Sequence, residues 1–293
     1  MSALEARIAA LPCWQGRPRI EPLVGGLSNA SFAVTDGTGR YVARAGTDYP
    51  FHHVSRQREL MTARAAHAAG FAPEVVYAET GLMVSRFIEG RVFGEAEVRD
   101  NIERIAGLVG RFHREMPAVV TGSGFMFWVF HVIRDYAHTL AGSTNPLARR
   151  LPELLATAAD LEAAQVPLPI VFGHNDLLPA NLIDDGRRLW LIDFEYAGFN
   201  TAMFDLAGLA SNAGCDARQS QALLDAYFGP AGRGLRHSHL AMQCASLLRE
   251  ALWALVSEMY LSAPGADYDA YARQNFDRFD AALAAYRAAT TEA

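Results

Sequence analysis

The sequence has few cysteines, no long apolar run and no basic cluster, and each absence excludes a class of protein. Its 293 residues include three scattered cysteines, Cys13, Cys215 and Cys244, without C-x-x-C spacing. This excludes a disulfide framework and a cysteine zinc site, so we expect free thiols in a reducing compartment. No stretch approaches the ~18 consecutive apolar residues of a membrane span. Residues 1–10 also lack the apolar core of a secretory signal, so we expect a soluble, cytoplasmic protein without membrane insertion.

Charged residues are moderately frequent and lean to the acidic side. The chain carries 26 Lys and Arg against 32 Asp and Glu, which gives a formal net charge of −6. Because nucleic-acid binding needs a basic run or patch, we expect no nucleic-acid partner. Hydrophobic residues make up 51% of the chain, enough for a substantial core in one or two domains.

The most informative stretch reads H-N-D-L-L-P-A-N at residues 174–181, followed by L-I-D at residues 191–193. Between them, two short apolar runs flank the turn-forming D-D-G of residues 184–186, a pattern that predicts a β-hairpin. In an antiparallel pair centred near this turn, Asn181 falls opposite Asp193. The sequence therefore predicts that an amide and a carboxylate lie side by side.

Such a pair of oxygen donors suits Mg²⁺ held jointly with nucleotide phosphates, so Asn181 and Asp193 are the predicted metal ligands. Asp176 is left to accept a proton from a hydroxyl nucleophile. The arrangement predicts a phosphoryl-transfer enzyme that uses ATP and Mg²⁺. The alternative, that these acids only form turns, is preferred for Asp184 and Asp185.

Periodicity divides the chain into a strand-rich first part and a mainly helical remainder. The predicted strands are 20–24, 31–35, 40–45, 75–77 and 82–85, with a helix at 53–70. The later predicted helices are about 95–116, 125–141, 146–164, 202–213, 216–228, 235–262 and 267–290. We expect an α+β fold of two lobes. Residues 1–86 would form a small antiparallel sheet with one helix, and residues 87–293 a larger helical lobe with the hinge, catalytic loop and acceptor-binding helices.

The H-N-D loop and the D-F-E at residues 193–195 resemble the aminoglycoside phosphotransferase superfamily, and in particular its choline/ethanolamine kinase branch. The resemblance covers roughly residues 20–260. It implies a bilobal protein kinase-like fold and transfer of the γ-phosphoryl group of ATP to a small alcohol. G-G-L-S-N at residues 25–29 resembles the family's phosphate-covering loop, and F-I-E-G at residues 87–90 resembles its hinge.

The resemblance implies a set of nucleotide-binding residues: Gly26, Ser28, Asn29, Arg44, Glu59, Phe87 and Ile88. Arg44 ends a strand where most kinases carry lysine, and its forked guanidinium could clamp phosphate oxygens, so we assign it a catalytic role with Asp176. Glu59 is the expected partner that orients Arg44. By the same resemblance, Asp205 should hydrogen-bond the catalytic-loop backbone, with His174 ordering that loop.

The acceptor is expected to be choline or ethanolamine, bound by Glu195, Glu250 and Trp253. Glu250 and Trp253 are three apart on one predicted helix face, and a tryptophan beside a carboxylate suits a cation. The family's W-x-x-W pattern is incomplete here, since Val256 stands where a second tryptophan would fall. The alternatives are a kinase of an aminoglycoside, thiamine, homoserine or a sugar, and a non-catalytic, nucleotide-binding pseudokinase-like protein.

Overall fold

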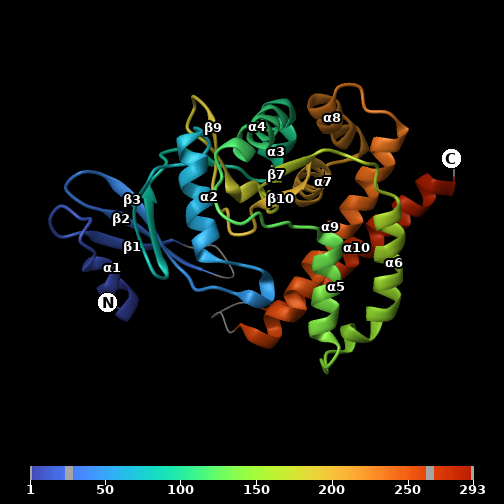
Figure 1. Ribbon diagram of the computed structural model, residues 1–293, viewed down its shortest axis with the longest axis horizontal. Helices are drawn as coiled ribbons and strands as arrows, with labels where there is room; N and C mark the ends of the chain where they lie inside the picture. Colours follow the sequence, from blue (N-terminus) through green and yellow to red (C-terminus); the bar gives the residue numbers. More distant parts are fainter. Residues whose placement is uncertain (1, 24–28, 262–266, 292–293) are drawn as a thin grey trace. The chain divides into compact units, whose positions relative to one another are not determined.

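The computed structural model describes residues 2–23, 29–261 and 267–291, which fold as two compact units (Figure 1). The sheet unit consists of Met1–Arg91 and Ile183–Glu195. The helical unit consists of Val92–Leu182 and Tyr196–Ala293. The chain therefore leaves the sheet unit, returns to it for thirteen residues, and leaves it again.

The sheet unit is built on a five-stranded antiparallel sheet in the order β1-β2-β3-β5-β4. Its strands are β1 (Arg19–Leu23), β2 (Ala30–Thr35), β3 (Arg40–Ala45), β4 (Val75–Glu79) and β5 (Leu82–Arg86). Helix α1 (Ala3–Ala9) adds Ile8 to a core that contains Val34, Ala43 and Val84, all fully buried. Helix α2 (Arg56–Ala68) contacts β4. The predicted meander, helix and two further strands are confirmed.

The helical unit is arranged around one long helix, α9 (Arg233–Tyr260), which contacts α5, α6, α7, α8 and α10. The other helices are α3 (Glu95–Asp100), α4 (Ile102–Glu115), α5 (Val129–Leu140), α6 (Leu151–Ala163), α7 (Ala202–Asn212), α8 (Ala217–Phe228) and α10 (Tyr268–Thr291). Short 3₁₀ turns lie at Pro50–His52, Met116–Ala118, Pro146–Arg150 and Pro179–Asn181. The middle of α9 is buried on almost every side, which explains its near-continuous apolar sequence.

Two small sheets complete the fold. Strands β7 (Ile170–Gly173) and β10 (Gly198–Thr201) pair antiparallel in the helical unit. Strands β6 (Arg91–Val92), β8 (Leu182–Asp184) and β9 (Leu189–Leu191) form a sheet in the order β6-β8-β9. The predicted hairpin is therefore present.

The turn of this hairpin uses the D-D-G residues as the sequence predicted. Asp184 Oδ1 accepts a hydrogen bond from Gly186 N at 2.9 Å. Asp185 Oδ1 accepts from the backbone N–H groups of Arg187 and Arg188, each at 2.8 Å. Gly186 has a φ of +82°, which favours glycine. The two aspartates therefore act as turn formers.

The observed division of the chain differs from the boundary predicted at residues 86/87. Residues 183–195, placed by the sequence in the helical lobe, pack with the sheet unit. Leu191 N donates to Phe71 O at 2.9 Å, and the Arg188 guanidinium donates to Gly70 O at 3.1 Å. These contacts join segments more than 100 residues apart, so periodicity could not reveal them.

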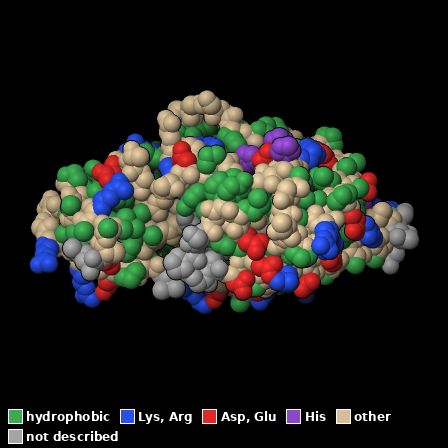
Figure 2. Space-filling model, turned by 90° about the horizontal axis from the view of Figure 1, so that it is seen from below, with side chains coloured by type: hydrophobic (Ala, Val, Ile, Leu, Met, Phe, Trp, Pro, Cys, Tyr) green, Lys and Arg blue, Asp and Glu red, His purple; other side chains and the backbone are tan. Residues whose placement is uncertain are grey.

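The structure agrees with the α+β class expected from the sequence. On the face drawn in Figure 2, basic side chains of the described residues are scattered among acidic and apolar ones. In the described part of the chain, no helix has both the length and the apolar character that crossing a membrane requires.

We predict that Leu248→Ala lowers the free energy of unfolding by about 2–5 kcal/mol, because the leucine is fully buried on α9 and leaves a cavity. Met259→Ala on the same helix is the control, since Met259 is 43% exposed and should change stability by less than about 1 kcal/mol. Urea unfolding of the two variants measures both values. Equal effects would contradict the central packing of α9.

Candidate active site

Two arginines and three acids of the sheet unit form an ion-pair cluster, the arginine–carboxylate cluster: Arg44, Arg56, Glu59, Asp193 and Glu195. Arg44 Nη1 lies 2.6 Å from Asp193 Oδ1 and 2.9 Å from Glu59 Oε1, and its Nη2 lies 3.0 Å from Glu195 Oε2. Arg56 Nη1 lies 2.6 Å from Glu59 Oε2 and 3.0 Å from Glu195 Oε2. The predicted contact between Arg44 and Glu59 is thus present.

Secondary structure brings these side chains together. Arg44 lies near the end of β3, and Arg56 is the first residue of α2. The backbone N–H of Arg56, which has no partner within its helix, donates to Asp48 Oδ1 at 2.7 Å. Glu59 follows one turn later on the same face of α2, and Asp193 and Glu195 follow strand β9.

Because the cluster is buried, the pKa values of Arg44 and Glu59 depend on the neighbouring charges. It opposes the charge of Arg44, but Asp193, Glu59 and Glu195 outweigh it and raise the pKa of Arg44. Burial raises the pKa of Glu59 despite the neighbouring guanidinium groups of Arg44 and Arg56. The cluster thus keeps a permanently charged guanidinium at the strand end, surrounded by acids.

Asn29 is the described residue of the predicted phosphate-covering loop. Its Nδ2 donates to Glu195 Oε2 at 2.9 Å, which attaches the loop's end to the cluster. Gly26 and Ser28, also predicted to bind the nucleotide, lie outside the described residues.

The predicted hinge residues Phe87 and Ile88 follow β5 and are half-buried. Phe87 N donates to Arg40 O at 3.0 Å, and the Arg40 guanidinium lies 4.0 Å from the centre of the Phe87 ring. One face of the ring is therefore covered by a cation. Their predicted contact with adenine stays a prediction.

In the helical unit, the buried carboxylate of Asp205 on α7 holds the H-N-D loop. Its Oδ2 accepts from His174 N at 2.7 Å and its Oδ1 from Asn175 N at 2.7 Å, which confirms the predicted role. His113 Nε2 lies 2.8 Å from Oδ2. Burial alone would raise the pKa of Asp205, but the hydrogen bond from His113 and the contacts with His174 hold it below the ordinary value.

The residues that lead into the H-N-D loop are tightly packed. A Cβ on Gly173 would lie 2.8 Å from Asn175 Oδ1 and 3.3 Å from Asp205 Oδ2, so a larger residue would displace the Asn175 amide. Asn175 has a φ of 63°, and its Nδ2 donates to Tyr196 O at 3.1 Å and Gly198 O at 3.2 Å. These bonds offset the strain of the left-handed backbone immediately before Asp176.

Asp176, the predicted base, is half-buried in this loop. Asn181 Nδ2 donates to the backbone carbonyl of Asp176 at 2.9 Å. This bond uses the amide N–H of Asn181 and leaves its Oδ1 to act as an oxygen ligand. The metal role of Asn181 stays a prediction, and this bond leaves its oxygen available for it.

Asp193 also adopts a left-handed backbone, with φ 68°. Its Oδ1 is buried and forms an ion pair with Arg44 Nη1, 2.6 Å away. By donor type, the Asp193 carboxylate and the Asn181 amide oxygen are each suited to Mg²⁺, and their joint metal role stays a prediction. Among the described residues, no group of three or more His, Cys, Asp or Glu could hold a metal by itself.

Helices α9 and α10, with the segment before β10, carry a second group in the helical unit, the acceptor-side cluster: Tyr196, Arg249, Glu250, Trp253 and Tyr271. Arg249 Nη1 lies 2.5 Å from Glu250 Oε2, and the Tyr271 hydroxyl donates to Glu250 Oε1 at 2.9 Å. Trp253 Nε1 donates to the Tyr196 hydroxyl at 2.9 Å. Trp253 is only 6% exposed, and the centres of its ring and the Tyr271 ring are 6.2 Å apart.

The three acceptor residues predicted from the sequence belong to different units. Glu250 and Trp253 belong to the acceptor-side cluster of the helical unit. Glu195 belongs to the arginine–carboxylate cluster of the sheet unit, where it pairs with Arg44 and Arg56. Because this buried carboxylate already meets two guanidinium groups, its contacts favour organising the arginines over binding a substrate cation.

The family model for the phosphotransferase enzyme family matches residues 19–237. The chain belongs to this family. A probable ethanolamine kinase from Arabidopsis thaliana is 28% identical over 214 residues, which cover 64% of this chain and 54% of that protein. The chain thus matches about half the length of this phosphotransferase relative.

Two solved structures have the same fold as this phosphotransferase. A choline/ethanolamine kinase family protein from Mesorhizobium loti superposes with a TM-score of 0.78 at 29% identity, over 99% of this chain and 98% of that one. The structure of LicA in complex with AMP superposes with a TM-score of 0.77 at 21% identity, over 98% of this chain and 100% of that one. At this identity the similarity shows the fold alone. The resemblance and the protein kinase-like α+β fold predicted from the sequence are confirmed.

Sequence reasoning missed Arg56, Arg249 and Tyr271 of these clusters, and His113, which contacts Asp205. Arg56 was visible in the R-x-x-E pattern beside Glu59, and Arg249 in the R-E-A-L-W pattern beside Glu250, but nothing marked either as buried. His113 carried no signal, because its partner Asp205 lies 92 residues away.

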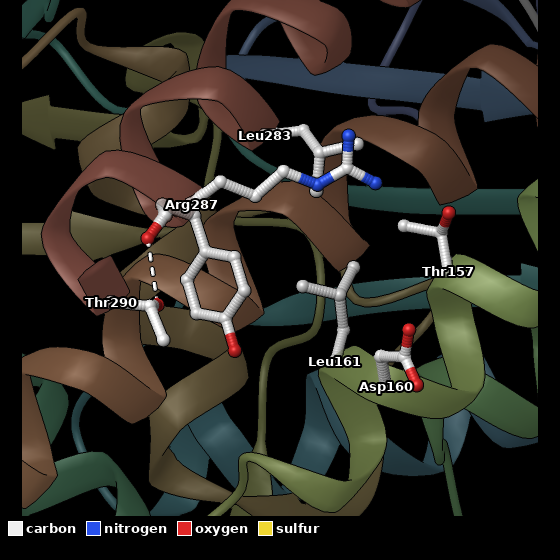
Figure 3. Close-up of a pocket in the computed structure, with 7 residues that line it drawn as sticks. Thr157, Asp160, Leu161, Leu283, Arg287 and Thr290 are labelled. Carbon is white, nitrogen blue, oxygen red and sulfur yellow. Dashed lines mark hydrogen bonds between the residues drawn. The ribbon is translucent and has the colours of Figure 1, made fainter.

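A cavity of about 300 Å³ lies elsewhere in this phosphotransferase, between α6 and α10 (Figure 3). Its lining residues are Thr157, Asp160, Leu161, Leu283, Tyr286, Arg287 and Thr290. Thr290 Oγ1 donates a hydrogen bond to Tyr286 O at 2.8 Å, drawn as the dashed line at Thr290 in Figure 3. None of the lining residues belongs to the predicted site.

We predict that Asp205→Asn lowers the free energy of unfolding by about 2–4 kcal/mol at neutral pH, because charge-assisted hydrogen bonds to a buried carboxylate are lost. The folded pKa of Asp205 is depressed, so this stabilisation is present above the ordinary aspartate pKa of about 3.9. It is lost as pH falls through the folded pKa. The gap between wild type and variant should therefore shrink on acidification.

Urea unfolding over a pH series measures that gap. The control is Asp100→Asn, because Asp100 is exposed in the same unit. A gap that stays constant below the ordinary aspartate range would contradict the assigned role of Asp205.

Proposed function

We propose that this phosphotransferase transfers the γ-phosphoryl group of ATP to the hydroxyl of an amino alcohol, choline or ethanolamine. The observation that supports it most comes from the acceptor-side cluster, in the unit that also carries Asp176. There the half-buried carboxylate of Glu250 accepts a hydrogen bond from Tyr271, whose ring packs against Trp253. A carboxylate beside aromatic rings suits an ammonium group. The names of the relatives, ethanolamine kinase and choline/ethanolamine kinase family protein, agree with this proposal.

On the nucleotide side, the guanidinium of Arg44 binds phosphate oxygens, and Glu59 and Glu195 hold it in place. Asn29 ends the loop that would cover the phosphates, and Phe87 and Ile88 would border the adenine. Asn181 and Asp193 would hold Mg²⁺, which when bound offsets negative charge on the phosphates.

On the acceptor side, Asp176 orients the hydroxyl and accepts its proton as the oxygen attacks phosphorus. Asp205 positions Asp176 by fixing the backbone of the two preceding residues. Glu250 holds the ammonium group, with Trp253 behind it. Catalysis then depends mainly on alignment and on charges that are already in place.

We predict that Asp176→Asn leaves ATP affinity within a few-fold of wild type and lowers kcat by about 10²–10⁴-fold, because the amide cannot accept the proton. Calorimetric titration of ATP with Mg²⁺ and a coupled ADP assay measure the two quantities. Asp100→Asn is the control and should leave both unchanged. Near-normal turnover of Asp176→Asn would exclude Asp176 as the base.

An acceptor panel tests the substrate. It contains choline, ethanolamine, thiamine, homoserine, an aminoglycoside and a neutral sugar, with ATP consumption as the readout. We expect choline or ethanolamine to give the highest kcat/KM. Preference for the sugar would refute the amino-alcohol assignment, and no consumption with any alcohol would favour a non-catalytic binding protein.

Glu250→Gln should raise the KM of the preferred amino alcohol about tenfold or more, because an amide cannot pair with an ammonium group. The KM of ATP should change little. Glu103→Gln, at an exposed position of α4, is the matched control. An unchanged acceptor KM would remove Glu250 from the acceptor site.

A further inference from the structure

The acceptor-side cluster contains a buried cation to which the proposed function gives no task. Arg249 lies in the middle of α9, and its side chain is 4% exposed. Its Nη1 pairs with Glu250 at 2.5 Å. Its Nε and Nη2 are buried, and neither donates a hydrogen bond to any residue in the described part of the chain.

Unfilled donors on a buried guanidinium are unusual. Each N–H has lost its water without gaining a protein partner, and most buried polar groups in folded proteins are paired. The faces of the guanidinium have neighbours: it lies 4.5 Å from the centre of the Tyr196 ring and 5.6 Å from that of Phe127. What lacks a partner is the Nε–Nη2 edge, which has the geometry that binds two oxygens at once.

Arg249 also stays protonated, and therefore positively charged, despite its burial. Burial opposes the charge, but Glu250, Tyr136, Tyr196 and Asp176 act together to raise the pKa of Arg249. Asp176, the proposed base, is thus close enough to interact with this guanidinium.

We propose that the Nε–Nη2 edge of Arg249 is an oxyanion-binding site in the acceptor half of the enzyme. This proposal rests on the proposed function, because phosphoryl transfer to an amino alcohol creates an oxyanion beside an ammonium group. Arg249 carries the positive charge that would bind the oxyanion, and the adjacent Glu250 carries the negative charge that would bind the ammonium group. The oxyanion is either the phosphate of the product or a carboxylate that the acceptor already carries, as in a hydroxy amino acid.

Binding of three compounds without nucleotide distinguishes the two sources. Ethanolamine carries no oxyanion, O-phosphoethanolamine carries a phosphate, and L-serine has the same amino alcohol skeleton with a carboxylate. Calorimetric titrations compare wild type with Arg249→Lys, which keeps the charge and loses the fork. Arg278→Lys is the matched control, since Arg278 of α10 already donates to Asn275 Oδ1 and Ser211 O.

If the site holds the product phosphate, Arg249→Lys weakens O-phosphoethanolamine binding about 10- to 100-fold and ethanolamine binding less than about threefold. If it holds an acceptor carboxylate, wild type binds L-serine more tightly than ethanolamine, and Arg249→Lys removes that preference. Arg278→Lys changes neither affinity. Unchanged affinity of Arg249→Lys for both anionic compounds overturns the proposal.

Two further measurements keep the proposal testable if Arg249→Lys does not fold or if the proposed function is wrong. A crystal structure of the wild-type enzyme with O-phosphoethanolamine should show phosphate oxygens hydrogen-bonded to Nε and Nη2; a phosphate bound elsewhere overturns the site. If the wild type phosphorylates no alcohol, the proposed function fails. Titration with inorganic phosphate still tests Arg249, because it requires no turnover.

Discussion

The geometry of this enzyme depends on one buried carboxylate that binds backbone rather than substrate. Asp205 accepts the N–H groups of His174 and Asn175, and through them it sets the direction of the chain as it enters Asp176. The left-handed backbone of Asn175 would relax without these bonds and those of its own amide. The loop that carries Asp176 therefore gains the rigidity of a helix, because the carboxylate that anchors this loop belongs to α7.

In the sheet unit, the position of Arg44 depends on the carboxylates that neutralise its buried charge. One guanidinium meets three carboxylates, and a second guanidinium, that of Arg56, shares two of them. Buried charges are tolerated when each has a partner of opposite sign, and removal of one partner leaves the other uncompensated. The cluster thus explains why an arginine at this strand end requires acids on α2 and after β9.

The sequence predicted most elements and many contacts of the site. The meander, the hairpin and most helices followed from periodicity, because each is a local pattern. The single helix predicted over about 95–116 is two helices, α3 and α4, which meet at Asn101. The contacts of Asp205 and Glu59 followed from family motifs. The role of Glu195 did not, since its arginine partners lie 151 and 139 residues away and motif spacing cannot show which lobe a side chain faces. Strands β6 and β10 were also missed, because strands of two and four residues give little periodic signal.

Because residues 183–195 return to the sheet unit, the protein cannot be split into its two units by one cut, and the sheet unit cannot be completed early in synthesis. The chain crosses between the units three times, so a single cut at residue 91 separates the sheet from the strand that leads to Asp193 and Glu195. On the ribosome, Arg44 and Arg56 emerge more than a hundred residues before Glu195. At roughly 5–20 residues per second, the first half of the chain waits several seconds for its missing acids. Until then, two cationic side chains that are buried in the finished protein have only Glu59 as an acidic neighbour from this cluster.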